Sequence, residues 1–179
     1  YSDHHLSHTL TALAYSKTKK DICSIVVDGF GDRSTASISQ VVDLTQINEL
    51  WACPYPLSLG LFYSTITDYL GFAINEGEYK VMGLSAYGDP DSKSAQLVKG
   101  LIDWDSNLNK LISDMSFFDY HLSISNSYST KLEDLLGPAR NPFVPLVPGD
   151  NDFKRCADIA RGAQDLIVYL LSKIFTHAN

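Results

Sequence analysis

Residues 22–32 of the chain read ICSIVVDGFGD. The first six are mostly apolar and β-branched, which predicts a buried strand over 22–27. Two glycines and two aspartates then predict a tight turn, and the weak alternation over 34–42 predicts a return strand. With a third strand predicted within 46–52, this part of the chain should form a small sheet built on a hairpin with a polar tip.

Segments with helical spacing of apolar residues flank this hairpin on both sides. Ser2 and Asp3 are suitable N-caps for a helix that reaches about Ser16. Further helices are predicted over 57–70, 76–87, 92–102, 130–136 and 151–175. The polar stretch 103–150 predicts an irregular insert, with short strands near 110–112 and 116–120 and a proline-rich loop over 137–150. This order indicates an α/β or α+β layered core in a single partial domain over 1–179.

Composition narrows the class of protein. A chain of 179 residues can bury one core, and a formal charge of −7 argues against a nonspecific nucleic-acid surface. Three cysteines without a CxxC predict free thiols in a reducing cytoplasm, with Cys23 buried. No apolar run approaches the roughly 20 residues that cross a bilayer. Because the chain starts at Tyr1 rather than Met and ends soon after an apolar helix, we expect the central piece of a longer protein.

Three of the five histidines fall in the motif HHLSH, residues 4–8. His4 and His8 share one face of a helix, at the spacing with which two imidazoles bind one transition metal. Zinc, iron, nickel and copper all suit imidazole, and a carboxylate or substrate oxygen must complete the site. A pair of capping or surface histidines is an equal alternative on spacing alone. Ligation requires neutral imidazole, so metal binding should weaken below about pH 6.

His5 points about 100° away from this pair, because successive helical residues are rotated by that angle. It is therefore not expected to bind the same metal. One interpretation makes it a general base toward an acceptor hydroxyl. The other makes it a structural residue that supports the neighbouring ligands, and this second interpretation carries more weight because ligating histidines commonly need such support.

The turn at Asp28, Gly29, Gly31 and Asp32 is a candidate phosphate loop. Glycines at the end of a strand let backbone amides approach a phosphate. A carboxylate beside them could hold Mg²⁺ or orient a nucleophile. The simpler alternative is an ordinary hairpin turn, for which Asp-Gly is the strongest short signal.

The stretch NEGEYKVMGL, residues 75–84, is a second candidate nucleotide site. Lys80 could neutralise a phosphate, and Glu78 could bind ribose hydroxyls. Gly83 costs about 1 kcal/mol relative to alanine inside a helix, which indicates close packing or a ligand. A helix start with acidic residues in its first turn would look the same and would need no ligand.

Taken together and in this order, several stretches resemble the carbamoyltransferase family that includes the nodulation protein NodU and antibiotic O-carbamoyltransferases. The matching segments are HHLSH at 4–8, VDGFGD at 27–32, PLSLGLFY at 56–63, LGF at 70–72 and EGEYKVMGLSAYG at 76–88. The segment ADIA at 157–160 and Gln164 also resemble the late helix of the family. The first five matches cover roughly residues 1–90.

The resemblance implies part of an actin-like or ribonuclease H-like ATPase domain, similar to the universal tRNA-threonylcarbamoyl protein. It implies Fe²⁺ or another divalent transition metal on His4 and His8, and it implies ATP, with Mg²⁺ as a further candidate. The carbamoyl group of carbamoyl phosphate would pass through carbamoyl-adenylate to a hydroxyl of a small molecule. Asp28–Asp32 would face the nucleotide phosphates, with Glu78 and Lys80 near the nucleotide.

By the same resemblance, parts of the site are expected outside this chain. The first phosphate loop should precede Tyr1, and a glycine-rich segment with the third metal ligand, an aspartate, should follow Asn179. The isolated chain is therefore expected to be inactive and to act at most as a metal- or nucleotide-binding module. Transfer of a threonylcarbamoyl group to tRNA is another alternative, although the stretch EYKVMG at 78–83 and the acidic charge argue against it.

Overall fold

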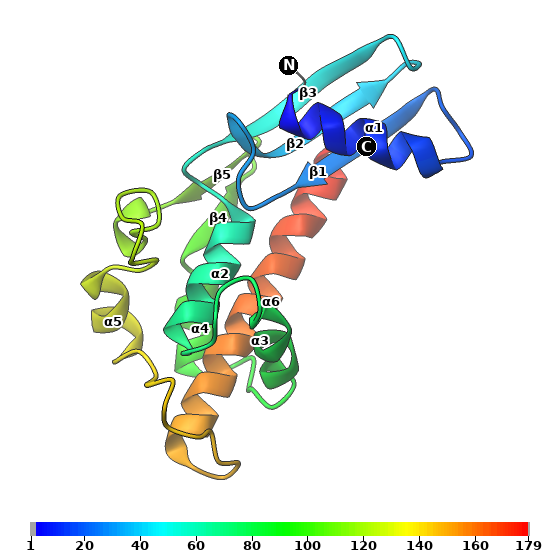
Figure 1. The fold of residues 1–179 in the computed structure, drawn as a ribbon. Coiled ribbons are helices and arrows are strands. Elements are labelled where there is room, and N and C mark those ends of the chain that lie inside the picture. The colour runs from blue at the N-terminus through cyan, green and yellow to red at the C-terminus, as the bar shows by residue number, and fades with distance from the viewer. Residues whose placement is uncertain (1–2, 179) are drawn as a thin grey trace. The chain divides into compact units, whose positions relative to one another are not determined.

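The computed structural model describes residues 3–178 and has the mixed α/β class predicted from the sequence. The chain divides into two compact units, residues 1–60 with 173–179 and residues 61–172, which are described separately. Figure 1 shows the order of the elements. Their bounds are α1 (His4–Tyr15), β1 (Ile22–Val27), β2 (Ser34–Val41), β3 (Ile47–Pro54), α2 (Leu59–Tyr69), α3 (Glu78–Ser85), α4 (Lys93–Lys99), β4 (Ile102–Asp105), β5 (Lys110–Ser113), the 3₁₀ turn η1 (Met115–Phe117), α5 (Thr130–Leu136) and α6 (Asn151–His177). The actin-like topology stays a prediction.

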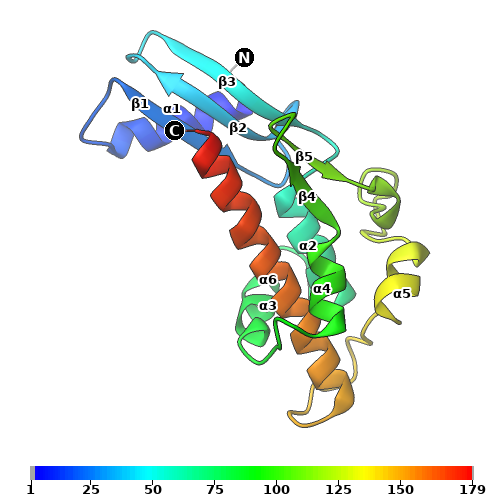
Figure 2. The ribbon, with the colours of Figure 1, turned by 180° about the vertical axis from the view of Figure 1, so that it is seen from behind.

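The first unit is an antiparallel sheet in the order β1-β2-β3 with α1 packed against it, as Figures 1 and 2 show. The predicted hairpin and third strand are confirmed. β1 pairs with β2 without a register shift, whereas the pairing of β2 with β3 shifts twice. Ala36, Ile38 and Val41 of the central strand β2 are buried.

The face of the sheet beneath α1 carries serines as well as aliphatic residues. In the register of β1 and β2, Ser24 lies opposite Ser39 and Val26 lies opposite Ser37. Two side chains of α1 form hydrogen bonds with these serines: Thr9 Oγ1 lies 2.9 Å from Ser24 Oγ, and His5 Nδ1 lies 2.8 Å from Ser37 Oγ. The helix is therefore seated by directional polar contacts as well as by apolar packing.

The prediction that β1 is buried is wrong. Its residues are half-buried or exposed, Val27 is 38% exposed, and Cys23 is an exposed free thiol. The reason is the place of β1 in the sheet, because within the described residues it pairs only with β2 and so forms an edge. A run of β-branched residues predicts a strand, but it does not predict whether that strand has a neighbour on one side or on both, and so it does not predict burial.

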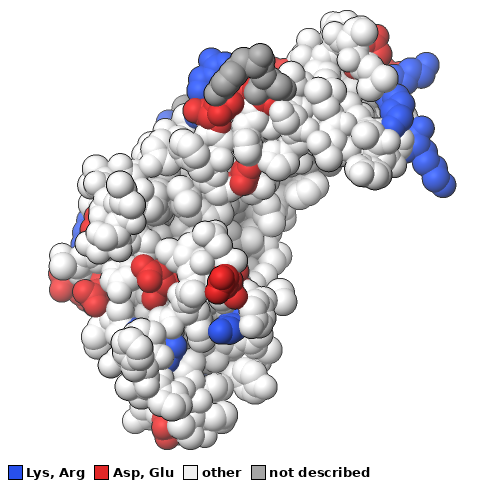
Figure 3. All heavy atoms as spheres, viewed as in Figure 1, with Lys and Arg blue, Asp and Glu red and all other residues white. Residues whose placement is uncertain are grey.

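Both ends of α1 are capped. The Asp3 carboxylate accepts a hydrogen bond from the Leu6 N–H at 3.1 Å, as predicted, whereas Ser2 lies outside the described residues. At the other end Lys19 Nζ donates to the carbonyls of Leu13 and Ala14. Figure 3 shows basic side chains gathered over the loop between α1 and β1, which holds Lys17, Lys19 and Lys20. These cations complement the carboxyl end of the helix dipole.

The second unit is a helical core around α2 and α6. Its fully buried side chains come from distant parts of the sequence and include Phe62, Ile66, Leu70, Phe118, Leu132, Ile159, Leu166 and Leu170. Figure 2 shows α4 beside α6, where a Cβ on Gly162 would lie 2.6 Å from the Ala95 carbonyl oxygen. No helix among residues 3–178 combines the length and apolar character that crossing a bilayer requires.

Two predictions for this unit need correction. The helix expected over 92–102 ends at Lys99, and Ile102 instead begins β4, which pairs with β5 as a hairpin. The strand expected over 116–120 is replaced by η1 and by an isolated bridge between Phe118 and Tyr128. Because Phe118 packs edge-on against Phe62 at a ring distance of 6.2 Å, part of the expected insert belongs to the core.

The turn after α3 is tightly joined to α6. A Cβ on Gly88 would lie 2.2 Å from the Ala157 carbonyl oxygen. The next residue, Asp89, donates its N–H to the buried carboxylate of Asp158 at 2.7 Å. Gly83 is different, because outside its own helix backbone no atom of the described residues lies within 4 Å of the position where its Cβ would be. The close-packing interpretation of Gly83 is therefore wrong.

These two glycines give a matched test of packing. Gly88→Ala should lower the free energy of unfolding by about 1–3 kcal/mol, because the added methyl group must displace backbone atoms of α6. Gly83→Ala should raise it by about 0.5–1 kcal/mol, because alanine is the better helix former and the space is open. Denaturant unfolding followed by circular dichroism measures both. Equal effects of the two substitutions would contradict the packing around Gly88.

Thiol labelling tests the exposure of the three cysteines. Burial raises the pKa of the Cys156 thiol to about 11 and also raises that of Cys53, and both side chains are buried. At pH 8 a thiol reagent should therefore modify only Cys23 in the folded chain and all three cysteines after denaturation. Cys23→Ser should abolish the labelling of the folded chain, and labelling that persists in this variant would show that the assignment is wrong.

Candidate metal-binding site

Three side chains of the first unit converge at the start of α1. His4 and His8 lie on one face of the helix, and Asp28 follows directly after β1. Asp28 Oδ2 is 2.7 Å from His4 Nε2 and 3.1 Å from His8 Nε2, and the two imidazole nitrogens are 3.1 Å apart. The three side chains are 42%, 53% and 30% exposed in the order His4, His8 and Asp28. The cluster is therefore open to solvent on one side.

The donor set of this cluster fits a transition metal. Two imidazole nitrogens and a carboxylate oxygen are ligands that zinc and iron accept. A tetrahedral ion with bonds of about 2.1 Å separates its ligand atoms by about 3.4 Å, close to the distances found here. These three atoms all carry lone pairs, so their crowding requires a cation or a proton between them.

The carboxylate of Asp28 is held in its ionised form. Burial alone would raise its pKa, but hydrogen bonds with His4 and with the Gly29 N–H outweigh this effect and lower the pKa. Gly29 N donates to Asp28 Oδ1 at 2.6 Å, which leaves Oδ2 directed at the two histidines. Asp28 thus supplies a negative charge at the point where the imidazole nitrogens meet.

The backbone around Asp28 is fixed from two sides. Asp28 N donates to the Thr35 carbonyl at 2.8 Å across the hairpin. The buried Ser58 hydroxyl is 3.3 Å from the Asp28 carbonyl and 2.7 Å from that of Gly29. A Cβ on Gly60 would lie 2.7 Å from Gly29 Cα, so the chain at the start of α2 packs closely on the loop. Contacts from the hairpin and from the segment around Ser58 therefore hold the backbone that carries Asp28.

The rest of the predicted phosphate loop is occupied by contacts within the chain. Gly31 N donates to the Ser34 carbonyl at 3.0 Å, which closes the hairpin turn. Asp32 Oδ2 accepts the N–H of His4 at 3.1 Å and so caps the first residue of α1. Binding of a phosphate by Asp28, Gly29, Gly31 and Asp32 stays a prediction, whereas the contact of Asp32 with the metal-site helix is a feature of the structure.

His5 is turned inward, away from His4 and His8. Its side chain is 5% exposed, and its Nδ1 lies 2.8 Å from Ser37 Oγ and 3.1 Å from Ser34 Oγ. Burial lowers its pKa, although the nearby Asp28 and Asp3 charges act in the opposite direction. The ring is therefore a buried base with a low tendency to take up a proton.

The remaining predicted residues lie on α3, in the second unit. Both carboxylate oxygens of Glu78 are engaged locally: Oε1 accepts from Asn75 N at 2.9 Å and Oε2 from Gly77 N at 3.1 Å. Burial would raise the pKa of Glu78, but these backbone N–H groups lower it. Lys80 Nζ lies 5.8 Å from the centre of the Phe72 ring. Binding of a nucleotide by Glu78, Lys80 and Gly83 stays a prediction.

Sequence reasoning missed the place of Asp28 in the cluster with His4 and His8. It expected the third carboxylate to come from beyond Asn179, and it assigned Asp28 to a nucleotide. The available signal was a carboxylate directly after a strand that precedes a hairpin turn. The partners of His5, Ser34 and Ser37, left no signal, because serines in a strand predict nothing about a helix some 30 residues earlier.

Comparison with known proteins identifies the family. A family model described as the N-terminus of carbamoyltransferases matches residues 1–165. The chain is 33% identical over 154 residues to an uncharacterized protein of Synechocystis, sll1178, which covers 85% of this chain. It is 38% identical over 90 residues to the nodulation protein NolNO of Sinorhizobium fredii and 40% identical over 89 residues to NolO of Bradyrhizobium diazoefficiens, each covering 50% of this chain.

These alignments cover only part of each relative. They span 24% of the Synechocystis protein, 13% of NolNO and 16% of NolO. The matched region nevertheless includes most of the chain, and the family model includes His4, His8 and Asp28. The chain therefore belongs to the carbamoyltransferase family and carries the region described as its N-terminus.

Proposed function

We propose that the protein to which this chain belongs is an ATP-dependent O-carbamoyltransferase of the cytoplasm. It moves a carbamoyl group from carbamoyl phosphate to a hydroxyl of a small molecule. Water releases phosphate from carbamoyl phosphate, the resulting carbamate displaces pyrophosphate from ATP to give carbamoyl-adenylate, and the acceptor hydroxyl then displaces AMP. Membership of the carbamoyltransferase family and similarity to two nodulation proteins support the transfer reaction. The convergence of His4, His8 and Asp28 is the single structural observation that carries the proposed site.

In this proposal His4, His8 and Asp28 hold Fe²⁺ or another divalent transition metal. Such an ion, when bound, supplies Lewis acidity that can polarise a carbonyl or phosphoryl oxygen. The chain itself directs two imidazole nitrogens and one carboxylate oxygen to one point and leaves their outer side open to solvent. Asp32 supports this arrangement because it fixes the first residue of α1 to the same loop.

The nucleotide part of the proposal rests on α3. Lys80 supplies a positive charge beside the ring of Phe72, and Gly83 leaves open space at the helix surface. Tyr79 and Met82 are exposed on the same short helix, 65% and 58% respectively. We propose that this surface contacts ATP, with Glu78 ordering the first turn of the helix and Mg²⁺ accompanying the phosphates.

Substitution of the cluster tests the metal. Loss of a residue that only supports a metal ligand weakens metal binding by about 10–100-fold. In the full-length protein, His4→Ala and Asp28→Asn should each weaken binding of Fe²⁺ by more than this, because each removes a ligand. His177→Ala, which changes an exposed histidine outside the cluster, should bind as the wild type does. Titration with Fe²⁺ under anaerobic conditions measures the affinity. Equal affinity of wild type and His4→Ala would refute the assignment of His4 as a ligand.

A product assay tests the reaction itself. The full-length protein, incubated with ATP and carbamoyl phosphate, should release pyrophosphate because formation of carbamoyl-adenylate expels it. Omission of carbamoyl phosphate should abolish the release and serves as the control. A folded, metal-loaded protein that releases no pyrophosphate would contradict the adenylate route.

A further inference from the structure

His5 is a buried polar residue between two exposed members of the metal cluster. We propose that it is a positioning residue: its imidazole locks the first turn of α1 to β2 and to the β1–β2 loop, and so sets the separation of His4, His8 and Asp28. This inference rests on the proposed metal site, but it concerns the chain's own contacts.

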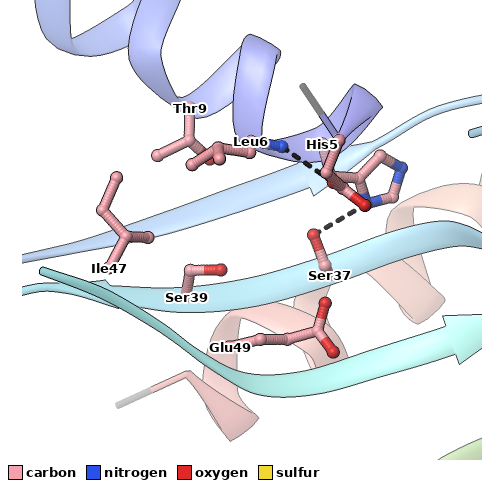
Figure 4. Close-up of a pocket in the computed structure, with 8 residues that line it drawn as sticks. His5, Leu6, Thr9, Ser37, Ser39, Ile47 and Glu49 are labelled. Atoms are coloured by element: carbon pink, nitrogen blue, oxygen red, sulfur yellow. Dashed lines mark hydrogen bonds between the residues drawn. The ribbon is translucent and has the colours of Figure 1, made fainter. Parts of the chain in front are cut away.

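The first contact joins α1 to the central strand of the sheet. His5 Nδ1 lies 2.8 Å from Ser37 Oγ and 3.1 Å from Ser34 Oγ, and Ser37 is only 2% exposed. Figure 4 shows the His5 ring directed from the first turn of α1 toward Ser37. Both serines belong to β2, so one imidazole nitrogen ties the start of the helix to two points of the middle strand.

The second contact joins α1 to the loop that carries Asp28. A Cβ on Gly31 would lie 2.8 Å from His5 Nε2, so the loop can pass the ring only because residue 31 is glycine. Gly31 is three residues beyond Asp28. The imidazole that forms hydrogen bonds with β2 therefore also limits how closely the β1–β2 loop, which carries Asp28, can approach the helix.

Stability alone does not explain a histidine here. Nε2 is buried and has no hydrogen-bond partner among residues 3–178, the part of the chain that the structure describes. A neutral imidazole has one donor and one acceptor nitrogen, so Nε2 is left unsatisfied whichever tautomer Nδ1 adopts. An orphaned buried polar group is destabilising and requires an explanation. The directional bond of Nδ1 to the serines is the property that an apolar residue of similar size would lack.

Side chains do not fill the whole space between this part of α1 and the sheet. A cavity of about 170 Å³ lies between α1 and the sheet, and Figure 4 shows His5, Thr9, Ser37 and Ser39 around it. Metal sites require ligand distances within about 0.2 Å of their ideal values. A helix beside a cavity needs a fixed contact to meet that tolerance, and His5 is adjacent to His4 and one turn before His8.

The same geometry argues against His5 as a general base. A base must come within hydrogen-bond reach of the proton that it removes. Here Nε2 is buried behind Gly31 and Nδ1 is engaged by two serine hydroxyls, with the whole residue 5% exposed. The structure thus favours the supporting role among the two interpretations of His5.

Two serines allow a matched experiment on the full-length protein. Ser37→Ala removes the 2.8 Å partner of His5, whereas Ser24→Ala removes the 2.9 Å partner of Thr9 on the same helix. Each removes one hydroxyl between α1 and the sheet, and neither touches a ligand. Titration with Co²⁺ reports both the affinity and, through the visible absorption of the bound ion, the ligand geometry.

We expect Ser37→Ala to lower the affinity for Co²⁺ by about 10–100-fold and to change the spectrum of the bound ion. Ser24→Ala should match the wild type, and Ser37→Thr, which keeps a hydroxyl, should restore much of the affinity. If circular dichroism shows that Ser37→Ala is unfolded, Ser34→Ala takes its place and should likewise lower the affinity for Co²⁺.

A wild type that binds Co²⁺ while Ser37→Ala and Ser24→Ala behave alike would overturn the role of His5. A wild type that binds no Co²⁺ would overturn the proposed metal site itself.

Discussion

The bond between His5 Nδ1 and Ser37 Oγ holds the first turn of α1 on the central strand of the sheet. Most helices are held on a sheet by apolar side chains, which tolerate small sliding motions because their attraction has no direction. Here serines line the sheet beneath the helix, and one buried imidazole meets two of them. A hydrogen bond weakens steeply when its angle or distance departs from the ideal. The bonds of His5 therefore restrict the position of α1 more narrowly than apolar contacts would.

The accuracy matters because the cluster is assembled from two separate elements. The helix brings His4 and His8 together through its own periodicity, whatever the rest of the chain does. Asp28 reaches them only if the β1–β2 loop and α1 keep their relative position. Asp32, which accepts the N–H of His4, and Ser58, which holds the carbonyls of the loop, contribute to the same alignment.

The parts of the fold that depend on nearby residues could be predicted from the sequence. β1 and α5 have the predicted bounds, and Asp3 caps α1, because strand propensity, helical spacing and capping are local properties. The edge position of β1 and the pairing of β4 with β5 depend on distant segments, so the local pattern did not reveal them. The same limit applies to the site. The pairing of His4 with His8 follows from their spacing in the sequence, whereas the position of Asp28 beside them depends on the tertiary structure.

The proposed ligands are divided between a helix and a loop. This division couples the binding of a metal ion to the docking of α1 on the sheet. Asp28 is 24 residues from His4 and 20 from His8, so the three side chains meet only when α1 is docked on the sheet. An ion that binds all three recognises the docked state alone, and its binding free energy is added to that of docking. The docking of α1 would then follow the free metal concentration around the protein, and removal of the ion would weaken the docking of this helix.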